Sequence, residues 1–225
     1  MKHAWTADAA RNNARWCDAV CFAHGKGGRF LEHMWVNADP VPRFYPNAVT
    51  LTRGEGDVAE QRQIVRILLK SNLPGRWAVK DSFNCLDIAR LGFDVLFEAN
   101  WIRHPPSKGV ATASRLSWER GVHGADTMPA VLFSDENFAL FSGRRDGKVV
   151  AGGTLYRAEN VVGLSNVVAE AGDASVVWHD LVTLASKTFP GLPLVGYESG
   201  NELKAAHKAG FEIGEPLRIW VRARD

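Results

Sequence analysis

A repeated pattern relates residues 56–103, GDVAEQRQIVRILLKSNLPGRWAVKDSFNCLDIARLGFDVLFEANWIR, to residues 172–222, GDASVVWHDLVTLASKTFPGLPLVGYESGNELKAAHKAGFEIGEPLRIWVR. An opening Gly-Asp, a Pro-Gly, a Gly-Phe and a closing Trp-x-Arg recur at offsets that grow slowly from 116 to 119 residues. Three single-residue insertions account for this drift, because the first stretch holds 48 residues and the second 51. The pattern predicts an internal repeat, although two α/β segments can also match in this way by coincidence.

Each stretch predicts the order helix, strand, helix, strand. Asp57 and Asp173 are good N-caps for the first helix, and Pro-Gly ends it. In the second stretch its apolar face consists of Val177, Leu181, Leu184, Ala185 and Phe189, whereas His179, Asp180 and Lys187 fall elsewhere. A strand over 194–197, a helix over about 201–209 that ends at Gly210, and a last strand through 219–221 follow.

Further elements are expected upstream of both stretches. The sequence predicts strands over 137–142, 148–156 and 161–168 in the second half, with a hairpin turn at Asp146-Gly147, and a helix over 8–22 followed by strands over 29–36 and 47–52 in the first. Residues from Pro105 to about Asp126 are rich in turn formers, and Trp118 among them is expected to pack on one unit. We therefore expect an N-terminal unit over 1–108, a linker over 109–127 and a C-terminal unit over 128–225.

The order of elements, with a short helix that ends in Gly-Phe before the last strand, resembles the GNAT N-acetyltransferase superfamily. The residues that carry the resemblance are AHKAGFE at 206–212 and ARLGFD at 89–94, and it extends over roughly 29–103 and 137–222. It implies an α/β (α+β) fold made of two GNAT-like units in tandem, each a mixed, mostly antiparallel sheet flanked by helices. It also implies acetyl-CoA or another acyl-CoA as cosubstrate and an amine as acceptor.

Family members bind the CoA diphosphate at a loop with the pattern [QR]-x-x-G-x-[GA], where backbone N–H groups at a helix N-terminus meet the phosphates. In the first half Arg53 and Gly56 match this pattern, but Val58 stands at the last position. In the second half Gly172 and Ala174 match, but Ala169 replaces the Arg or Gln. Each copy thus keeps two of the three defining positions.

The loop of the second copy also holds Ala171 and Asp173, and Glu170 lies just before them. The resemblance assigns Ala171, Gly172, Asp173 and Ala174 to the binding of CoA. Glu170 and Asp173 would place negative charge near a phosphate, and an N-capping Asp173 would compete for the same amides. The acidic side chains therefore weigh against diphosphate binding at this loop.

In the family, the strand before this loop splays from its neighbour, pairs with the pantetheine arm and polarises the thioester carbonyl with a backbone N–H. Here that strand is 161–168, which assigns Ser165 and Asn166 to hydrogen bonds with pantetheine or acceptor and the N–H groups around Val167 and Val168 to the oxyanion. The alternative is that Asn166 marks a β-bulge or pairs with buried backbone.

The sequence departs from the family at the acid and base groups. The family's Tyr, which protonates the leaving thiolate, is replaced by Ala206 and, in the first copy, by Ile88; His207 points about 100° around the helix from that position. Candidates for accepting the amine proton are Glu198 and Tyr197, at the end of a strand, with Glu170 as another carboxylate. The alternative is that Glu198, like its counterpart Asp81, is a turn residue or helix cap.

Composition excludes several other classes of protein. Of the 225 residues 46% are hydrophobic, and 27 basic against 25 acidic residues leave a net charge of +2, so we expect a folded protein with no nucleic-acid partner. Neither a membrane span nor a signal peptide is found, which favours a cytoplasmic location. Three cysteines do not form a disulfide framework. Cys17, Cys21 and His24 share a helix face, but cysteines at this spacing usually pack, and we expect no metal site.

Two functions remain open. The first is an acyl-CoA-dependent N-acyltransferase whose C-terminal unit is catalytic. The second is a catalytically inactive tandem GNAT-like module that binds a ligand or protein partner. Splayed central strands would favour the enzyme, and closed ones would favour the module.

Overall fold

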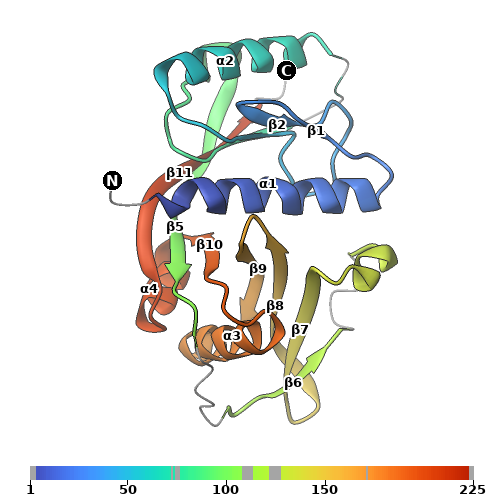
Figure 1. Cartoon of the computed structure of the whole chain (residues 1–225), viewed down its shortest axis with the longest axis vertical. Coiled ribbons are helices and arrows are strands. Elements are labelled where there is room, and N and C mark those ends of the chain that lie inside the picture. The colour runs from blue at the N-terminus through green and yellow to red at the C-terminus, as the bar shows by residue number, and fades with distance from the viewer. Residues whose placement is uncertain are drawn as a thin grey trace. The chain divides into compact units, whose positions relative to one another are not determined.

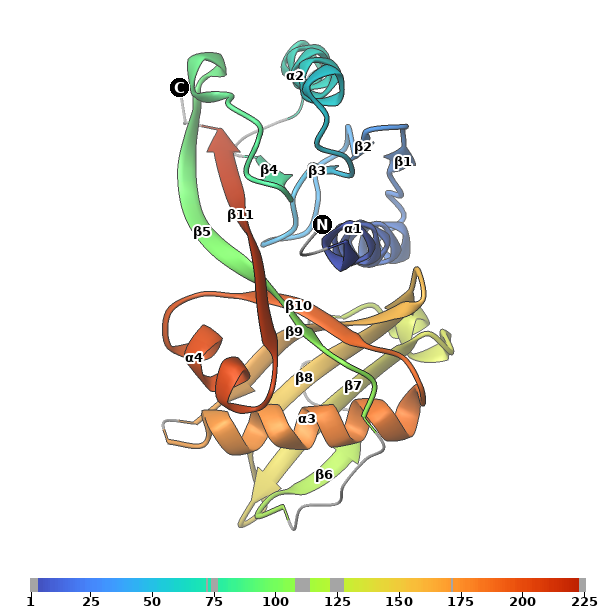
Figure 2. The same ribbon diagram turned by 60° about the vertical axis from the view of Figure 1, so that its left-hand side comes forward.

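The computed structural model describes residues 4–71, 73, 77–107, 114–121, 128–170 and 172–222. The chain divides into two compact units (Figures 1 and 2). The first consists of Met1–Ala99 together with Glu215–Asp225, and the second of Asn100–Gly214. The boundaries therefore lie inside two strands, β5 (Phe93–His104) and β11 (Glu212–Arg222), and each of these strands contributes residues to both units.

The first unit holds two helices and a mixed sheet. Its elements are α1 (Trp5–Ala23), β1 (Arg29–Phe30), β2 (Met34–Val36), β3 (Ala48–Thr50), α2 (Glu55–Leu69), β4 (Ala78–Asp81) and the 3₁₀ turn η1 (Ala89–Leu91), with parts of β5 and β11. Strands β1, β2 and β3 pair antiparallel, β3 pairs with β4 in parallel, and β4 pairs antiparallel with β11.

Helices α1 and α2 cover opposite faces of this sheet. Successive side chains of a strand point to opposite faces, so neighbouring residues pack against different helices. Met34 and Ala48 belong to the cluster that includes α2, whereas Trp35 and Val49 pack with α1. Cys17 and Cys21 lie in the α1 cluster, which confirms that they pack in the core. Burial raises the pKa of both thiols, that of Cys21 to about 12.

The second unit repeats this plan with longer strands. Its elements are β6 (Ser117–Arg120), the 3₁₀ turn η3 (Ala130–Ser134), β7 (Phe138–Arg145), β8 (Lys148–Ala158), β9 (Val161–Ala169), α3 (Ala174–Thr188), β10 (Leu194–Glu198) and α4 (Gly200–Lys208), with the remaining parts of β5 and β11. Strands β6 to β9 pair antiparallel in sequence order, β9 pairs with β10 in parallel, and β10 pairs antiparallel with β5.

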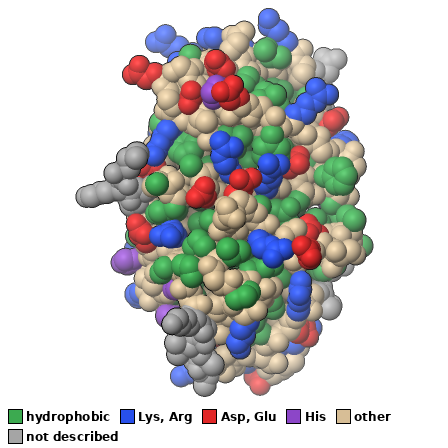
Figure 3. Space-filling model, in the orientation of Figure 1, with side chains coloured by type: hydrophobic (Ala, Val, Ile, Leu, Met, Phe, Trp, Pro, Cys, Tyr) green, Lys and Arg blue, Asp and Glu red, His purple; other side chains and the backbone are tan. Residues whose placement is uncertain are grey.

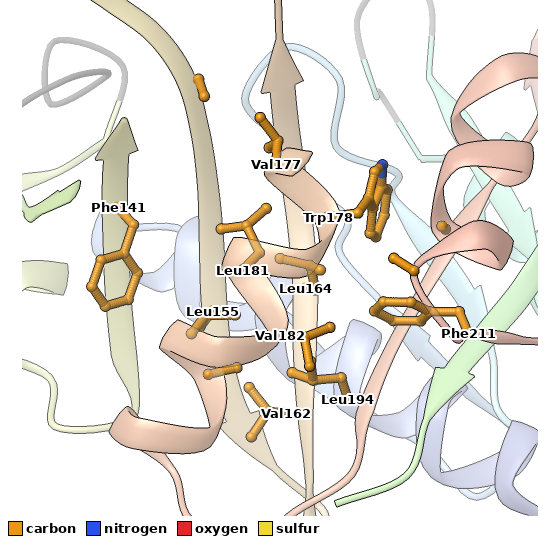
Figure 4. Close-up of a cluster of buried hydrophobic side chains, with 14 of the residues drawn as sticks. Phe141, Leu155, Val162, Leu164, Val177, Trp178, Leu181, Val182, Leu194 and Phe211 are labelled. Carbon is orange, nitrogen blue, oxygen red and sulfur yellow. The ribbon is translucent and has the colours of Figure 1, made fainter. Parts of the chain in front are cut away.

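Helix α3 lies across the sheet of this unit (Figure 2) and forms its core with α4. Leu181 and Trp178 point from α3 toward the strand residues Leu155 and Leu164 and toward Phe211 (Figure 4). At Gly153 the helix comes so close that a Cβ atom would lie 2.8 Å from the Leu181 side chain. Glycine at this position of β8 therefore permits the contact between helix and sheet.

The two units share one order of strand pairing. β1–β2–β3–β4 in the first corresponds to β7–β8–β9–β10 in the second, and α2 and α3 each connect the two parallel strands. The next strand is exchanged between the two halves of the sequence. β5 follows the first copy but pairs with β10, and β11 follows the second copy but pairs with β4.

The structure corrects several details predicted from the sequence. Residues 29–36 form two short strands and not one, and the helix expected before Gly92 is the 3₁₀ turn η1. The compact units, Met1–Ala99 with Glu215–Asp225 and Asn100–Gly214, differ from the expected units 1–108 and 128–225. Within the expected linker, residues 117–120 form β6, which pairs with β7. Trp118 does pack on the second unit, where its Nε1 donates to Asp180 Oδ2 over 2.9 Å. Asp180, expected outside the apolar face, is only 5% exposed.

The described residues contain no helix that combines the length and the hydropathy needed to cross a lipid bilayer.

Candidate functional site

Strand β9 carries a bulge in the second unit. Thr154 of β8 pairs with Ser165, but Gly152 pairs with Val168, so β9 has one residue more than β8 in this interval. Asn166 takes up the extra length at φ +52°, and its Nδ2 lies 3.5 Å from Thr154 Oγ1. Asn166 therefore marks a β-bulge, which was one of the two alternatives left open by the sequence.

The bulge changes which side chains of β9 face the core. Leu164 and Val167 both contact the α3 cluster, although they are three residues apart, whereas Val168 is 63% exposed. Without an inserted residue, alternation would place them on opposite faces. The bulge therefore keeps apolar residues on the helix side and turns the backbone between Ser165 and Val168 out of the regular pairing.

Strands β9 and β10 separate shortly after they meet. Their parallel pairing joins only Leu194 to Val162 and Val195 to Gly163, whereas β10 pairs with β5 along its whole length. At Gly196 the two backbones are still close, because a Cβ atom there would lie 2.8 Å from the Leu164 carbonyl oxygen. The remainder of β9, including the bulge, lies beyond the pairing with β10. The parallel pairing of the two central strands therefore covers only the first two residues of β10, and the splay expected from the sequence stays a prediction.

The loop before α3 is acidic and is held by an arginine. Arg145, at the end of β7, donates from Nη2 to Asp173 Oδ2 over 2.7 Å, and its Nη1 lies 3.8 Å from Glu170 Oε2. Asp173 is the N-cap residue of α3 but makes no side-chain cap hydrogen bond. The expectation that Asp173 competes for the helix amides was therefore wrong, because its carboxylate is bonded to Arg145.

Other residues assigned to this loop are placed as follows. Gly172 is exposed with φ +93°, a conformation that glycine adopts at little cost, and Ala174 begins the helix. Ala171 lies outside the described residues.

Glu198 ends β10 as a half-buried carboxylate. Desolvation, together with the charge of Glu202, raises its pKa to about 7. Glu202 lies in the first turn of α4, where it accepts a hydrogen bond from Trp178 Nε1 over 3.2 Å. Within the described part of the chain, neither carboxylate forms an ion pair. An uncompensated carboxyl group with a pKa near neutrality is suited to accept a proton at physiological pH.

Tyr197 points to the other face of β10 from Glu198. It stands opposite Trp101 in the pairing with β5, and the two rings meet edge to face at 5.6 Å. Glu198 stands opposite Asn100. Because successive strand side chains alternate, the structure does not bring the two proposed proton acceptors together on one face.

Comparisons with known proteins agree on the fold. No family model matches the sequence, and no curated protein matches it. Among solved structures, a GCN5-related N-acetyltransferase from Kribbella flavida superimposes with a TM-score of 0.65 at 9% identity and 96% coverage of each chain. The chain has the GNAT fold.

Further structures support this fold. A GCN5-related N-acetyltransferase from Sphaerobacter thermophilus has a TM-score of 0.52 at 11% identity, over 96% of this chain and 93% of that one. A functionally unknown conserved protein from Staphylococcus epidermidis has a TM-score of 0.61 at 8% identity, over 88% of this chain and 93% of that one.

The position of the GNAT tyrosine is closed in the second unit. Ala206 is completely buried, and the neighbouring His207 has its Nδ1 within 3.1 Å of the Phe211 carbonyl oxygen. Neither residue supplies an acid for a leaving thiolate.

In the first unit, the side chains of the equivalent region bond to other residues of the same unit. Arg53 is paired with Glu215, and its guanidinium lies 5.5 Å from the centre of the Phe83 ring. Asp57 Oδ2 accepts a hydrogen bond from Gly54 N over 3.0 Å, and Gly56 is exposed in the first turn of α2. These bonds occupy the Arg53 side chain, and Asp57, expected as the N-cap of α2, lies at the N3 position behind the N-cap residue Gly54.

Sequence reasoning missed Arg145 and Glu202 as parts of the site. The predicted hairpin at Asp146-Gly147 was a usable signal, because it places Arg145 at the end of β7, two strands from β9. Glu202 lies four residues after Glu198, but only the bend between β10 and α4 brings their charges within reach.

Proposed function

We propose that the chain is an acyl-CoA-dependent N-acyltransferase that moves an acyl group, acetyl in the simplest case, to an amine. The second unit is its catalytic unit. The observation that carries this proposal is the end of the β9–β10 pairing after Gly163 and Val195, with a bulge at Asn166 on one strand and Glu198 at the end of the other.

The chemistry required of this site is limited. The pantetheine arm would extend along the part of β9 beyond its pairing with β10, near Ser165 and Asn166. Backbone N–H groups at Val167 and Val168 would then stabilise the oxyanion of the thioester carbonyl. The amine nitrogen attacks the carbonyl carbon, the carbon–sulfur bond breaks, and CoA departs as a thiolate. Glu198 accepts the proton released by the amine.

Glu198 is the best placed of the three proton acceptors considered. Glu170 is exposed, and its carboxylate already lies beside the Arg145 guanidinium. Tyr197 faces Trp101 on the other side of β10. Catalysis would otherwise consist of orienting the amine against the thioester.

A non-catalytic role is the second candidate. The buried Ala206 and the acidic loop at Glu170 and Asp173 favour it, because each departs from what a CoA-dependent enzyme of this fold needs. The ligand would then occupy the same opening without reacting. The two candidates differ in whether an acylated amine is formed.

The acceptor is expected to be a small-molecule or peptide amine and not a nucleic acid. Basic and acidic side chains alternate on the face drawn in Figure 3, where those described form no extended basic surface. Binding to a phosphate backbone depends on such a surface.

Calorimetric titration with acetyl-CoA and CoA, followed by an acylation assay with a panel of amines, tests the proposal. We expect wild-type binding to be lost in Gly172→Glu and retained in Gly56→Glu. Gly191→Glu is the matched control, since Gly191 (φ +79°) also has a positive φ and open space around it. Absence of wild-type binding contradicts the proposal, and binding without any acylated product would favour the non-catalytic module.

A further inference from the structure

The end of the β7–β8 hairpin lies beside the loop that precedes α3. Arg145 pairs with Lys148 at the hairpin, and Glu170 N donates to the Val150 carbonyl over 3.0 Å, which holds the loop against β8. This arrangement brings the Arg145 guanidinium to Asp173 and Glu170. A basic side chain from a distant part of the sequence thus stands at the helix N-terminus.

Arg145 supplies the type of side chain that the loop itself lacks. The diphosphate pattern starts with Arg or Gln, and Ala169 stands there in this chain. Ala169 pairs with Ala151 on β8, and the next strand is β7, which ends at Arg145. The cation missing from β9 is therefore present two strands away.

The Arg145, Asp173 and Glu170 side chains together carry a net negative charge. Two carboxylates face one guanidinium, and the side chains of Arg145, Glu170 and Asp173 are 38%, 60% and 19% exposed. Water screens the pair with Glu170 strongly and the pair with Asp173 less, so Asp173 is the stronger of the two competitors. A diphosphate offers the same guanidinium a bidentate, doubly charged partner, so replacement of the carboxylates is energetically accessible.

We propose that Arg145 binds the diphosphate of the acyl-CoA donor, and that Asp173 and Glu170 occupy its guanidinium until the donor displaces them. This inference rests on the proposed function and deepens it, since it names the residue that selects a donor with a diphosphate. The carboxylates act as an internal competitor, which lowers donor affinity and makes it dependent on ionic strength.

The test is a calorimetric titration of the full chain with CoA and with pantetheine, which has no phosphate. Arg145→Gln should weaken CoA binding by roughly tenfold or more, and Asp173→Asn should strengthen it by roughly threefold or more. Neither change should alter the affinity for pantetheine. Arg144→Gln is the matched control, because Arg144 bonds Glu119 Oε1 at 2.7 Å and the Gly147 carbonyl, and it should leave CoA binding unchanged.

The outcomes separate this inference from the proposed function. If the wild type binds CoA and neither Arg145→Gln nor Asp173→Asn changes the affinity, the inference is wrong and the proposed function stands. If the wild type does not bind CoA but the Asp173→Asn, Glu170→Gln double variant does, Arg145 is the phosphate residue and the native carboxylates block it. If neither protein binds CoA, both proposals are overturned. Arg145→Lys, which keeps the charge, should retain part of the affinity and guards against a loss caused by misfolding.

Discussion

The two junctions between parallel strands differ in how their polar groups are used. At the β3–β4 junction of the first unit, Ser82 N donates to Thr50 Oγ1 over 2.8 Å just beyond the last paired residues, so the strands stay together. At the β9–β10 junction of the second unit, the position that corresponds to Thr50 is Asn166, at the same 116-residue offset, and it sits in a bulge. Both junctions have two paired residues on each strand, but beyond them the first is linked by the Thr50 side chain and the second carries a bulge.

The helices that follow these junctions show the same contrast. The carboxylate of Asp57 in the first turn of α2 accepts a hydrogen bond from Gly54 N, and this bond is the main cause that lowers the pKa of Asp57. The corresponding Asp173 leaves the start of α3 without a side-chain cap. Neither helix has a side-chain cap hydrogen bond at its N-cap residue, so the copies differ in the partner of this carboxylate, which is the Gly54 N–H for Asp57 and the Arg145 guanidinium for Asp173.

The carboxylates that end β4 and β10 extend the contrast. Asp81 is 1% exposed and accepts hydrogen bonds from the backbone N–H groups of Phe83, Cys85 and Leu86, so it is a turn residue. Burial raises the pKa of both carboxylates, but Glu198, whose pKa is raised to about 7, has no such bonds to oppose the desolvation. With one order of elements, the proposed proton acceptor therefore belongs to the copy whose strand-end carboxylate lacks backbone hydrogen bonds.

The largest expected difference between the two copies comes from replacing the strand-end carboxylate of each, Glu198 or Asp81, by its amide. Glu198→Gln should lower kcat/KM by roughly 100-fold or more, because it removes the proton acceptor. Asp81→Asn should leave kcat/KM unchanged and lower the melting temperature by several degrees, because the turn loses one of its two carboxylate oxygens. The measurement is steady-state acylation together with thermal unfolding. Equal losses of activity in both variants would remove the distinction between the two copies.

The same Glu198 variant should have the opposite effect on stability. Its pKa in the folded protein, about 7, lies above the ordinary value of 4.5, so the fold favours the protonated form. That contribution is complete below pH 4.5 and is lost as the pH rises through 7. Glu198→Gln should therefore melt at a higher temperature than the wild type at pH 8 and at the same temperature at pH 4.5. A variant less stable at pH 8 would show that Glu198 is a structural residue.

The bulge gives an intermediate effect that separates backbone geometry from side-chain chemistry. Asn166→Val places a β-branched residue at φ +52°, which should straighten β9 and lower kcat/KM by roughly tenfold. Asn166→Gly keeps the positive φ without the amide and should retain activity within about threefold. If the glycine variant is as impaired as the valine variant, the Asn166 amide itself contacts the substrate.

The strands and helices could largely be predicted, because apolar periodicity determined them. The predicted strand 161–168 and helix beginning after Asp173 are confirmed as β9 and α3. Apolar periodicity does not indicate which strands pair with one another. Nothing local to β5 distinguishes pairing with its own copy from pairing with β10, so the exchange of β5 and β11 needed the structure. Asp180 was misplaced because a polar residue on a helix reads as exposed unless its distant donors, here Trp118 and Ser114, are known.

The candidate site was predictable only where one segment of chain forms it. Asn166 could be named because an asparagine is unusual in an apolar strand, but the sequence did not decide between bulge and ligand. The pairing of Arg145 with Asp173 joins residues 28 positions apart across two strands. The pKa of Glu198 depends on burial and on Glu202, which sequence spacing does not encode. Long-range electrostatics therefore account for most of what was missed.

The smallest expected effect is that of Glu202. It tests whether the charge of Glu202 contributes to the raised pKa of Glu198. Removing this charge in Glu202→Gln should lower the pKa of Glu198, since a like charge nearby disfavours ionisation. The acid limb of the kcat/KM profile should then move to lower pH, and activity at pH 6 should rise by less than tenfold. Trp178 Nε1 can still donate to the amide oxygen, so the packing of α4 against α3 is retained. An unchanged acid limb would mean that desolvation alone sets the basicity of Glu198, and the first unit would then differ from the second in hydrogen bonding and not in charge.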